Sequence, residues 1–192
     1  DFNRLAKETI GCSPADIEAM INEAAIIAVQ NQKLFIDNYC IEQAYNKKVL
    51  KGHVKEDNSK RKQEELELVA WHEAGHAIAG LLLGTEISKV TILSSTSGVG
   101  GATFTIPSKM GLKSVEDLRN EVIQLYAGRC AEYLLYKDWM KTTTGASNDI
   151  DRATGIIFNM VSTLGMTEKN GMVNLNTLKI NNDLIADEVS SI

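Results

Sequence analysis

One short motif in the sequence has residue types and spacing that could bind a metal ion and use it. His72-Glu73-Ala74-Gly75-His76 has the pattern His-Glu-x-x-His. Apolar residues recur around it at three- and four-residue spacings, which predicts a helix. On a helix, residues i and i+4 share one face, so both imidazoles could bind the same ion. Glu73 would project about 100° around the helix from His72, beside the ion, where a zinc peptidase has its general base.

The alternative interpretation is a pair of helical histidines that bind no metal. The chain has three histidines, and two of them fall in this motif. A carboxylate at Glu73, among mostly apolar neighbours, is also costly unless it has a partner or a role. Both observations favour a metal site. The remaining histidine, His53, lies in a polar stretch and is expected to be solvated.

A catalytic zinc ion usually has three protein ligands, so a third residue is needed. A further histidine six positions after His76 would indicate a metzincin, but Leu82 occupies that position. Carboxylates on later segments are the candidates, and Asp149 follows a Thr/Gly/Ser/Asn cluster that is typical of a loop-to-helix junction. It could also be a simple helix cap. The residues alone leave four candidates: Asp149, Glu116, Glu121 and Glu132.

Composition limits the classes of partner and compartment. With 20 basic and 25 acidic residues the net charge is −5, which gives no electrostatic support for nucleic-acid binding. Three widely spaced cysteines indicate a reducing compartment without a disulfide framework. No apolar run is long enough to span a bilayer, so the chain is expected to be soluble. It begins without Met, and we expect it to be part of a longer protein.

The periodicity predicts a mainly α fold with one small β-hairpin. Residues 1–52 are expected to form a bundle of three helices, and residues 53–63 a polar linker. In the predicted domain 64–192, a helix over 64–83 carries the motif, and strands over 87–93 and 102–106 form the hairpin. A long helix from Ser114 to Tyr136 should bury Cys130 and Leu134, and further helices are expected over 150–165 and from 181 onward.

The motif also forms part of a wider resemblance. Together with Thr144-Gly145-Ala146-Ser147-Asn148-Asp149 and the segments 126–132 and 165–169, it resembles the FtsH family of ATP-dependent zinc metalloproteases, peptidase family M41. The start, at 11–16 and 22–25, is similar to the helical lid of that family's AAA+ module. The resemblance implies a lid over 1–52 and a zincin-like peptidase over 64–192. It also implies Zn²⁺ held by His72, His76 and Asp149, with Glu73 as the catalytic base.

The resemblance further implies a zinc metalloendopeptidase that degrades unfolded or membrane proteins. ATP would be hydrolysed by an ATPase core outside this chain, since no Walker motif occurs in it. The parent protein is expected to be a homo-hexamer with a membrane anchor outside these residues and its peptidase facing the cytoplasm. Two alternatives remain: a non-catalytic oligomerisation or interaction module, and a related protease without an anchor.

Overall fold

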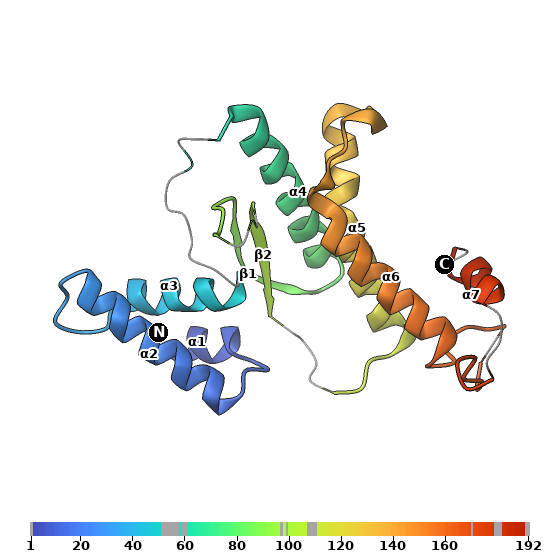
Figure 1. Ribbon diagram of the computed structural model, residues 1–192, viewed down its shortest axis with the longest axis horizontal. Coiled ribbons are helices and arrows are strands. Elements are labelled where there is room, and N and C mark those ends of the chain that lie inside the picture. Colours follow the sequence, from blue (N-terminus) through green and yellow to red (C-terminus); the bar gives the residue numbers. More distant parts are fainter. Residues whose placement is uncertain are drawn as a thin grey trace. The chain divides into compact units, whose positions relative to one another are not determined.

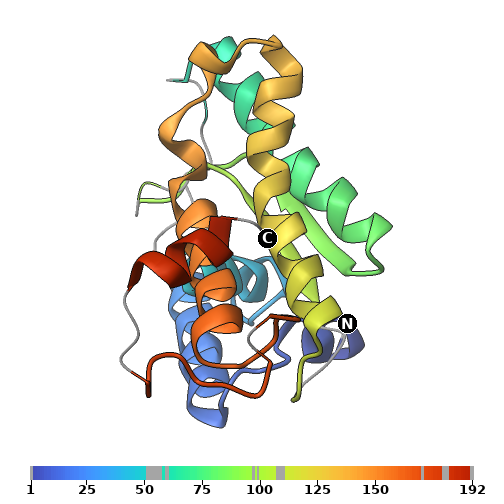
Figure 2. The ribbon, with the colours of Figure 1, turned by 90° about the vertical axis from the view of Figure 1, so that its right-hand side faces the viewer.

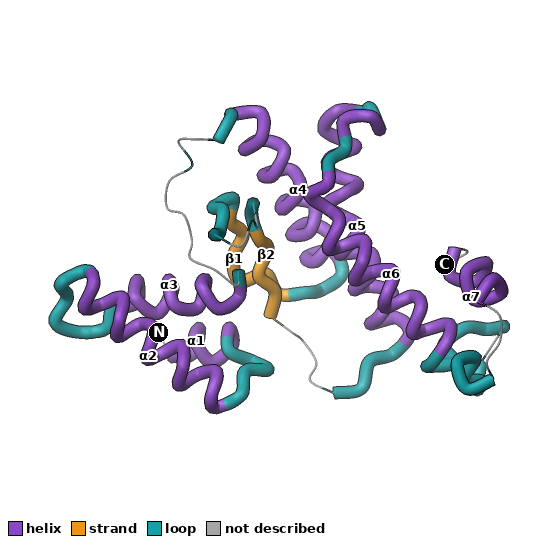
Figure 3. The backbone as a smooth tube through the Cα atoms, viewed as in Figure 1, coloured by secondary structure: helices purple, strands orange, loops and turns teal. Residues whose placement is uncertain are grey.

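The computed structural model of the chain describes residues 2–50, 58, 61–96, 98, 100–106, 111–169, 171–178 and 182–190. The chain divides into two compact units, residues 1–110 and 111–192. Each unit is described by itself below. Helices account for most of the described residues, and a two-stranded sheet accompanies them (Figure 3).

The first unit begins with three helices, α1 (Phe2–Glu8), α2 (Pro14–Gln30) and α3 (Asn38–Val49). Ser13 and Asp16 form a capping box at the start of α2, and Asp37 caps α3. These caps satisfy backbone N–H groups that have no partner within the helix. Helices α2 and α3 lie side by side (Figure 1). Small and flexible side chains fill their interface: Met20, Ala24, Ala28, Cys40 and Ala44.

The second half of this unit is a helix with a β-hairpin packed against it. Helix α4 (Gln63–Leu82) is followed by β1 (Glu86–Thr91) and β2 (Ala102–Ile106), which pair antiparallel. Gly84 has φ +78°, a left-handed conformation that ends the helix just before β1. Ser88 is the extra residue of a bulge, since Ile87 pairs with Thr105 and Lys89 with Phe104. Both strands contact α4.

The second unit is helical. Helix α5 (Val115–Tyr136) and α6 (Ser147–Ser162) run side by side (Figure 2), with the short 3₁₀ turns η1 (Trp139–Lys141) and η2 (Thr144–Ala146) between them in sequence. Helix α7 (Asn182–Ser190) packs on α6. The buried apolar core holds these three helices together and consists of Val122, Leu125, Ala153, Ile157, Val161, Leu175 and Ile185.

The structure confirms the predicted mainly α fold with a small hairpin. Predicted bounds differ by a few residues at several ends, because helix and strand termini are weakly specified by periodicity. The burial predicted for Cys130 and Leu134 is wrong: Cys130 is exposed and Leu134 is 60% exposed. Neither belongs to the buried apolar cluster to which Val122 and Leu125 of the same helix contribute.

Two predictions about domain organisation stay predictions. Most of the linker expected over 53–63, including His53, lies outside the described residues. The boundary expected between a lid over 1–52 and a peptidase over 64–192 is a functional division, and the compact units do not test it. Among the helices that are described, none combines the length and apolarity required for a membrane span.

Candidate metal centre

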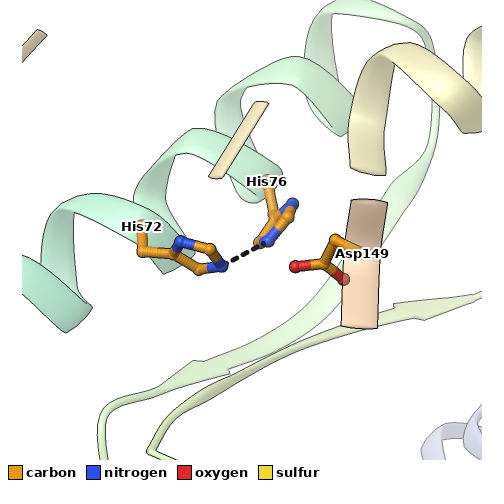
Figure 4. A group of neighbouring side chains, drawn as sticks. All are labelled: His72, His76 and Asp149. Atoms are coloured by element: carbon orange, nitrogen blue, oxygen red, sulfur yellow. Dashed lines mark hydrogen bonds between the residues drawn. The ribbon is translucent and has the colours of Figure 1, made fainter. Parts of the chain in front are cut away.

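The two motif histidines lie one turn apart on α4, as the helix predicts. Their Nε2 atoms are 3.0 Å apart (Figure 4). His76 is 9% exposed and His72 is half-buried. Two nitrogens bound to one zinc ion at about 2.05 Å, with tetrahedral geometry, would be about 3.3 Å apart. The pair therefore needs only a small adjustment to bind a single ion.

Arg61 fixes the start of the motif helix. The first residues of α4 lack a side-chain cap. Instead, Arg61 Nε lies 2.8 Å from the Glu65 carboxylate, and its Nη1 donates to the backbone oxygens of Ile92 and Gly100, both at 2.8 Å. A guanidinium suits this role because its donors have fixed directions. The bonds tie the helix to both sides of the hairpin loop.

Asp149 joins the two histidines. It lies in the first turn of α6 and is half-buried. One ligand atom from each of His72, His76 and Asp149 lies within 4.8 Å of the other two. Figure 4 shows the carboxylate turned toward the imidazole pair. In the part of the chain that the structure describes, no other group of three His, Cys, Asp or Glu side chains meets this condition.

The donor set fits zinc. Two neutral imidazoles and one carboxylate are the ligands of several catalytic zinc sites, and three protein ligands leave a coordination position for water. Magnesium and calcium prefer oxygen ligands, so the imidazole pair disfavours them. The chemistry of these residues therefore matches the ion that the sequence predicts.

The other carboxylates considered as third ligand lie in different environments. Glu116 is exposed, and Glu121 forms an ion pair with Lys113 at 2.6 Å. Glu132 is 1% exposed, and its carboxylate accepts a hydrogen bond from the backbone N–H of Thr143. The alternative role of Asp149 as a helix cap is also disfavoured, because Ala146 is the N-cap residue of α6.

A buried network holds the start of the segment that leads to Asp149. The carboxylate of Glu132 accepts a hydrogen bond from the backbone N–H of Thr143 at 2.9 Å and pairs with Arg129 at 3.2 Å. Arg129 also donates to the Thr143 carbonyl oxygen. The Thr143 hydroxyl in turn accepts from the N–H of Gly145 at 3.2 Å. Because the paired polar groups around a buried carboxylate resist displacement, this network fixes the backbone four to six residues before the ligand.

Glu73 is buried at 6% exposure, next to the first ligand in sequence. The hydroxyl of Thr103 on β2 lies 2.8 Å from Glu73 Oε2 and 3.0 Å from the Glu73 carbonyl oxygen. A carboxylate so placed can accept a proton from a water molecule near the cluster and release it again. The sequence motif located Glu73 but gave no indication of Thr103.

Sequence reasoning also missed Arg129 and the role of Glu132. The alternation Thr-Phe-Thr-Ile in β2 shows that Thr103 and Thr105 share a face, but not that this face meets α4. For Arg129 and Glu132, the spacing i, i+3 on a predicted helix was the available signal, and it indicates an ion pair without identifying the backbone that the pair binds.

Two family models match the chain. Residues 59–191 match Peptidase family M41, and residues 1–42 match the AAA+ lid domain. The peptidase match includes the whole candidate metal centre, and the lid match covers α1, α2 and the start of α3.

Several curated relatives are similar over most of the chain. The chain is 36% identical over 177 residues to "ATP-dependent zinc metalloprotease FtsH 1" of Alkaliphilus metalliredigens. It is 39% identical over 176 residues to "ATP-dependent zinc metalloprotease FtsH" of Streptococcus pneumoniae serotype 4. These alignments cover 91% and 90% of the chain, but only 30% and 26% of the two relatives. The chain thus spans less than a third of these relatives, and on the extent of the peptidase match it belongs to peptidase family M41.

Proposed function

We propose that the chain is a zinc metalloendopeptidase whose metal is held by His72, His76 and Asp149 and whose general base is Glu73. The observation that supports this most strongly is the approach of the three ligand atoms to within 4.8 Å. The relatives' names, which describe zinc metalloproteases, support the same activity.

Glu73 and the three metal ligands have different roles in peptide hydrolysis. When bound, zinc acts as a Lewis acid that lowers the pKa of water and polarises a carbonyl oxygen. Glu73 accepts a proton as the water oxygen attacks the carbonyl carbon of the peptide. It then gives that proton to the leaving nitrogen as the C–N bond breaks, so the carboxylate ends the cycle unchanged. His72, His76 and Asp149 would hold the ion.

We also propose that the longer protein containing this chain depends on ATP for its activity. The relatives are named ATP-dependent, and the AAA+ lid match is consistent with such a protein. We propose that ATP is bound and hydrolysed by a segment outside these 192 residues and that unfolded or membrane proteins are the substrates. A homo-hexamer anchored in a membrane, with the peptidase on the cytoplasmic side, is the arrangement that we propose for the parent protein.

Replacing Glu73 with Gln tests the assigned base. Gln keeps the shape of the side chain but cannot accept the proton. We expect cleavage of casein and of a short fluorogenic peptide to fall by roughly 10²- to 10⁴-fold. Zinc content, measured by elemental analysis, should stay at the parent level. Glu67, exposed on the same helix, provides the matched control: Glu67→Gln should cleave at the parent rate.

Two results would contradict this function. Cleavage by Glu73→Gln at the parent rate would show that Glu73 is not the base. A parent protein that binds zinc but cleaves neither substrate would instead favour a non-catalytic interaction module.

A further inference from the structure

The start of β2 lies unusually close to the motif helix at Glu73. A Cβ atom added to Gly101 would lie 2.7 Å from Val69 Cγ1 and 3.0 Å from Glu73 Cγ. Real side chains do not tolerate such distances, so a glycine is needed where the strand meets the helix. Two residues later, Thr103 reaches the Glu73 carboxylate.

The Thr103 hydroxyl has one hydrogen and two acceptors within reach, both on Glu73. A hydroxyl donates a single hydrogen bond. The carboxylate Oε2 is the nearer acceptor, at 2.8 Å against 3.0 Å for the carbonyl oxygen. It also carries charge, and hydrogen bonds to charged acceptors are stronger than those between neutral groups. The hydroxyl therefore donates mainly to the carboxylate.

The backbone around Thr103 is fixed on its other sides. Thr103 pairs with Val90 in the β-ladder. The next residue, Phe104, points to the opposite face, is 4% exposed, and packs against the Tyr45 ring at a centroid distance of 5.7 Å. The donor on Thr103 thus has little freedom to move away from its acceptor.

The carboxylate plane of a glutamate has a single orientation only when a hydrogen-bond donor holds one of its oxygens. The terminal torsion of a Glu side chain is broad, so the rotamer of Glu73 does not by itself fix its carboxylate plane. A donor on one oxygen restricts rotation and directs the second oxygen. Proton transfer depends on this direction, because the two heavy atoms must come within about 2.6–3.2 Å.

We propose that Thr103 is a positioning residue for peptide hydrolysis: its hydroxyl orients the Glu73 carboxylate for proton transfer without touching the substrate. This inference rests on the proposed role of Glu73 as the base. It assigns to the hairpin a part in catalysis, in addition to its packing on α4.

Three variants separate the hydroxyl from the shape of the side chain. Thr103→Val removes the donor and keeps the branched shape, whereas Thr103→Ser keeps the donor. Thr105→Val is the matched control, since Thr105 is an exposed residue of the same strand. We expect kcat on a fluorogenic peptide to fall about 10- to 100-fold in Thr103→Val, with KM changed less than about twofold. Thr103→Ser and Thr105→Val should stay within about threefold of the parent.

A second measurement, the urea midpoint of unfolding, does not depend on peptide cleavage. Without its donor, the buried Glu73 carboxylate loses a partner, so Thr103→Val should lower the urea midpoint of the first unit. Fluorescence of Trp71 follows that unit once Trp139, the other tryptophan, is replaced by Phe. In a Glu73→Ala background, which has no carboxylate, the shift should largely disappear.

The outcomes distinguish this inference from the function on which it rests. Normal kcat in Thr103→Val, an equal loss in Thr103→Ser, or loss of zinc in Thr103→Val would each overturn the positioning role. If Glu73→Gln is inactive while Thr103→Val is normal, only the inference fails. If Glu73→Gln cleaves normally, the assigned base itself fails.

Discussion

Replacing Glu132 with Gln is expected to weaken both the second unit and its affinity for zinc. Glu132 is 1% exposed, and its carboxylate pairs with Arg129, whose side chain is 16% exposed. Gln keeps the size of the side chain and an oxygen that can accept from the Thr143 N–H. It removes the negative charge, so the guanidinium loses its charged partner where little water can replace it.

The magnitude follows from the contacts that lose their charge. Hydrogen bonds to charged groups contribute about 1.5–3 kcal/mol, so we expect Glu132→Gln to lower the free energy of unfolding by about 2 kcal/mol. Glu132→Ala also removes the acceptor and should lower it by about 3–5 kcal/mol. Glu116→Gln, an exposed position on the same helix, should stay within about 0.5 kcal/mol of the parent.

Trp139 allows this unit to be followed alone. In a Trp71→Phe background it is the one remaining tryptophan, and it lies next to the Tyr133 ring in the second unit. Urea titration by its fluorescence gives the free energy of unfolding, and competition with a chelator gives the zinc affinity. We expect the affinity to fall about 10-fold or more, because Glu132 fixes the segment that leads to Asp149. Parent-like stability and affinity in Glu132→Gln would refute this reasoning.

Three further predictions concern Gly101 and Asp37 of the first unit and Gly155 of α6. Gly101→Ala should destabilise the chain by about 1–3 kcal/mol, because its Cβ would overlap Val69. Gly155→Ala has open space around the new Cβ and should stabilise α6 by up to about 1 kcal/mol. Urea titration measures both changes, and an unchanged free energy of unfolding in Gly101→Ala would contradict the close packing. A hydrogen bond from Lys33 lowers the pKa of Asp37 to about 2 from an ordinary 3.8. This contribution to stability is therefore complete above pH 3.8 and lost as the pH falls through about 2. In Asp37→Asn the free energy of unfolding should depend less on pH between 3.8 and about 2 than it does in the parent. The same pH dependence in both proteins over this range would contradict the assignment.

The sequence predicted those parts of the fold that depend on local pattern. Capping boxes at Ser13 and Ser114 located two helix starts, and the spacing of His72 and His76 placed both on one face. Burial was predicted less well, since apolar periodicity in α5 is weak and does not show which side meets α6. For that reason Cys130 and Leu134 were wrongly expected in the core.

The site was predictable only where one segment carries it. His72, Glu73 and His76 follow from a single helical turn. Asp149, 73 residues beyond His76, was one of four candidates until the resemblance favoured it. The contact of Thr103 with Glu73 depends on the packing of a strand on a helix, and the binding of Thr143 by Glu132 on two segments that meet only in the folded unit. No local pattern encodes such contacts.

The central claim is that His72, His76 and Asp149 bind one zinc ion together, and the zinc affinity of Asp149→Ala tests it most directly. Chelator competition on the purified protein should show a loss of about 10- to 100-fold or more relative to the parent, since one of three ligands is removed. An unchanged affinity would contradict the account, because Asp149 would then have no part in holding the metal.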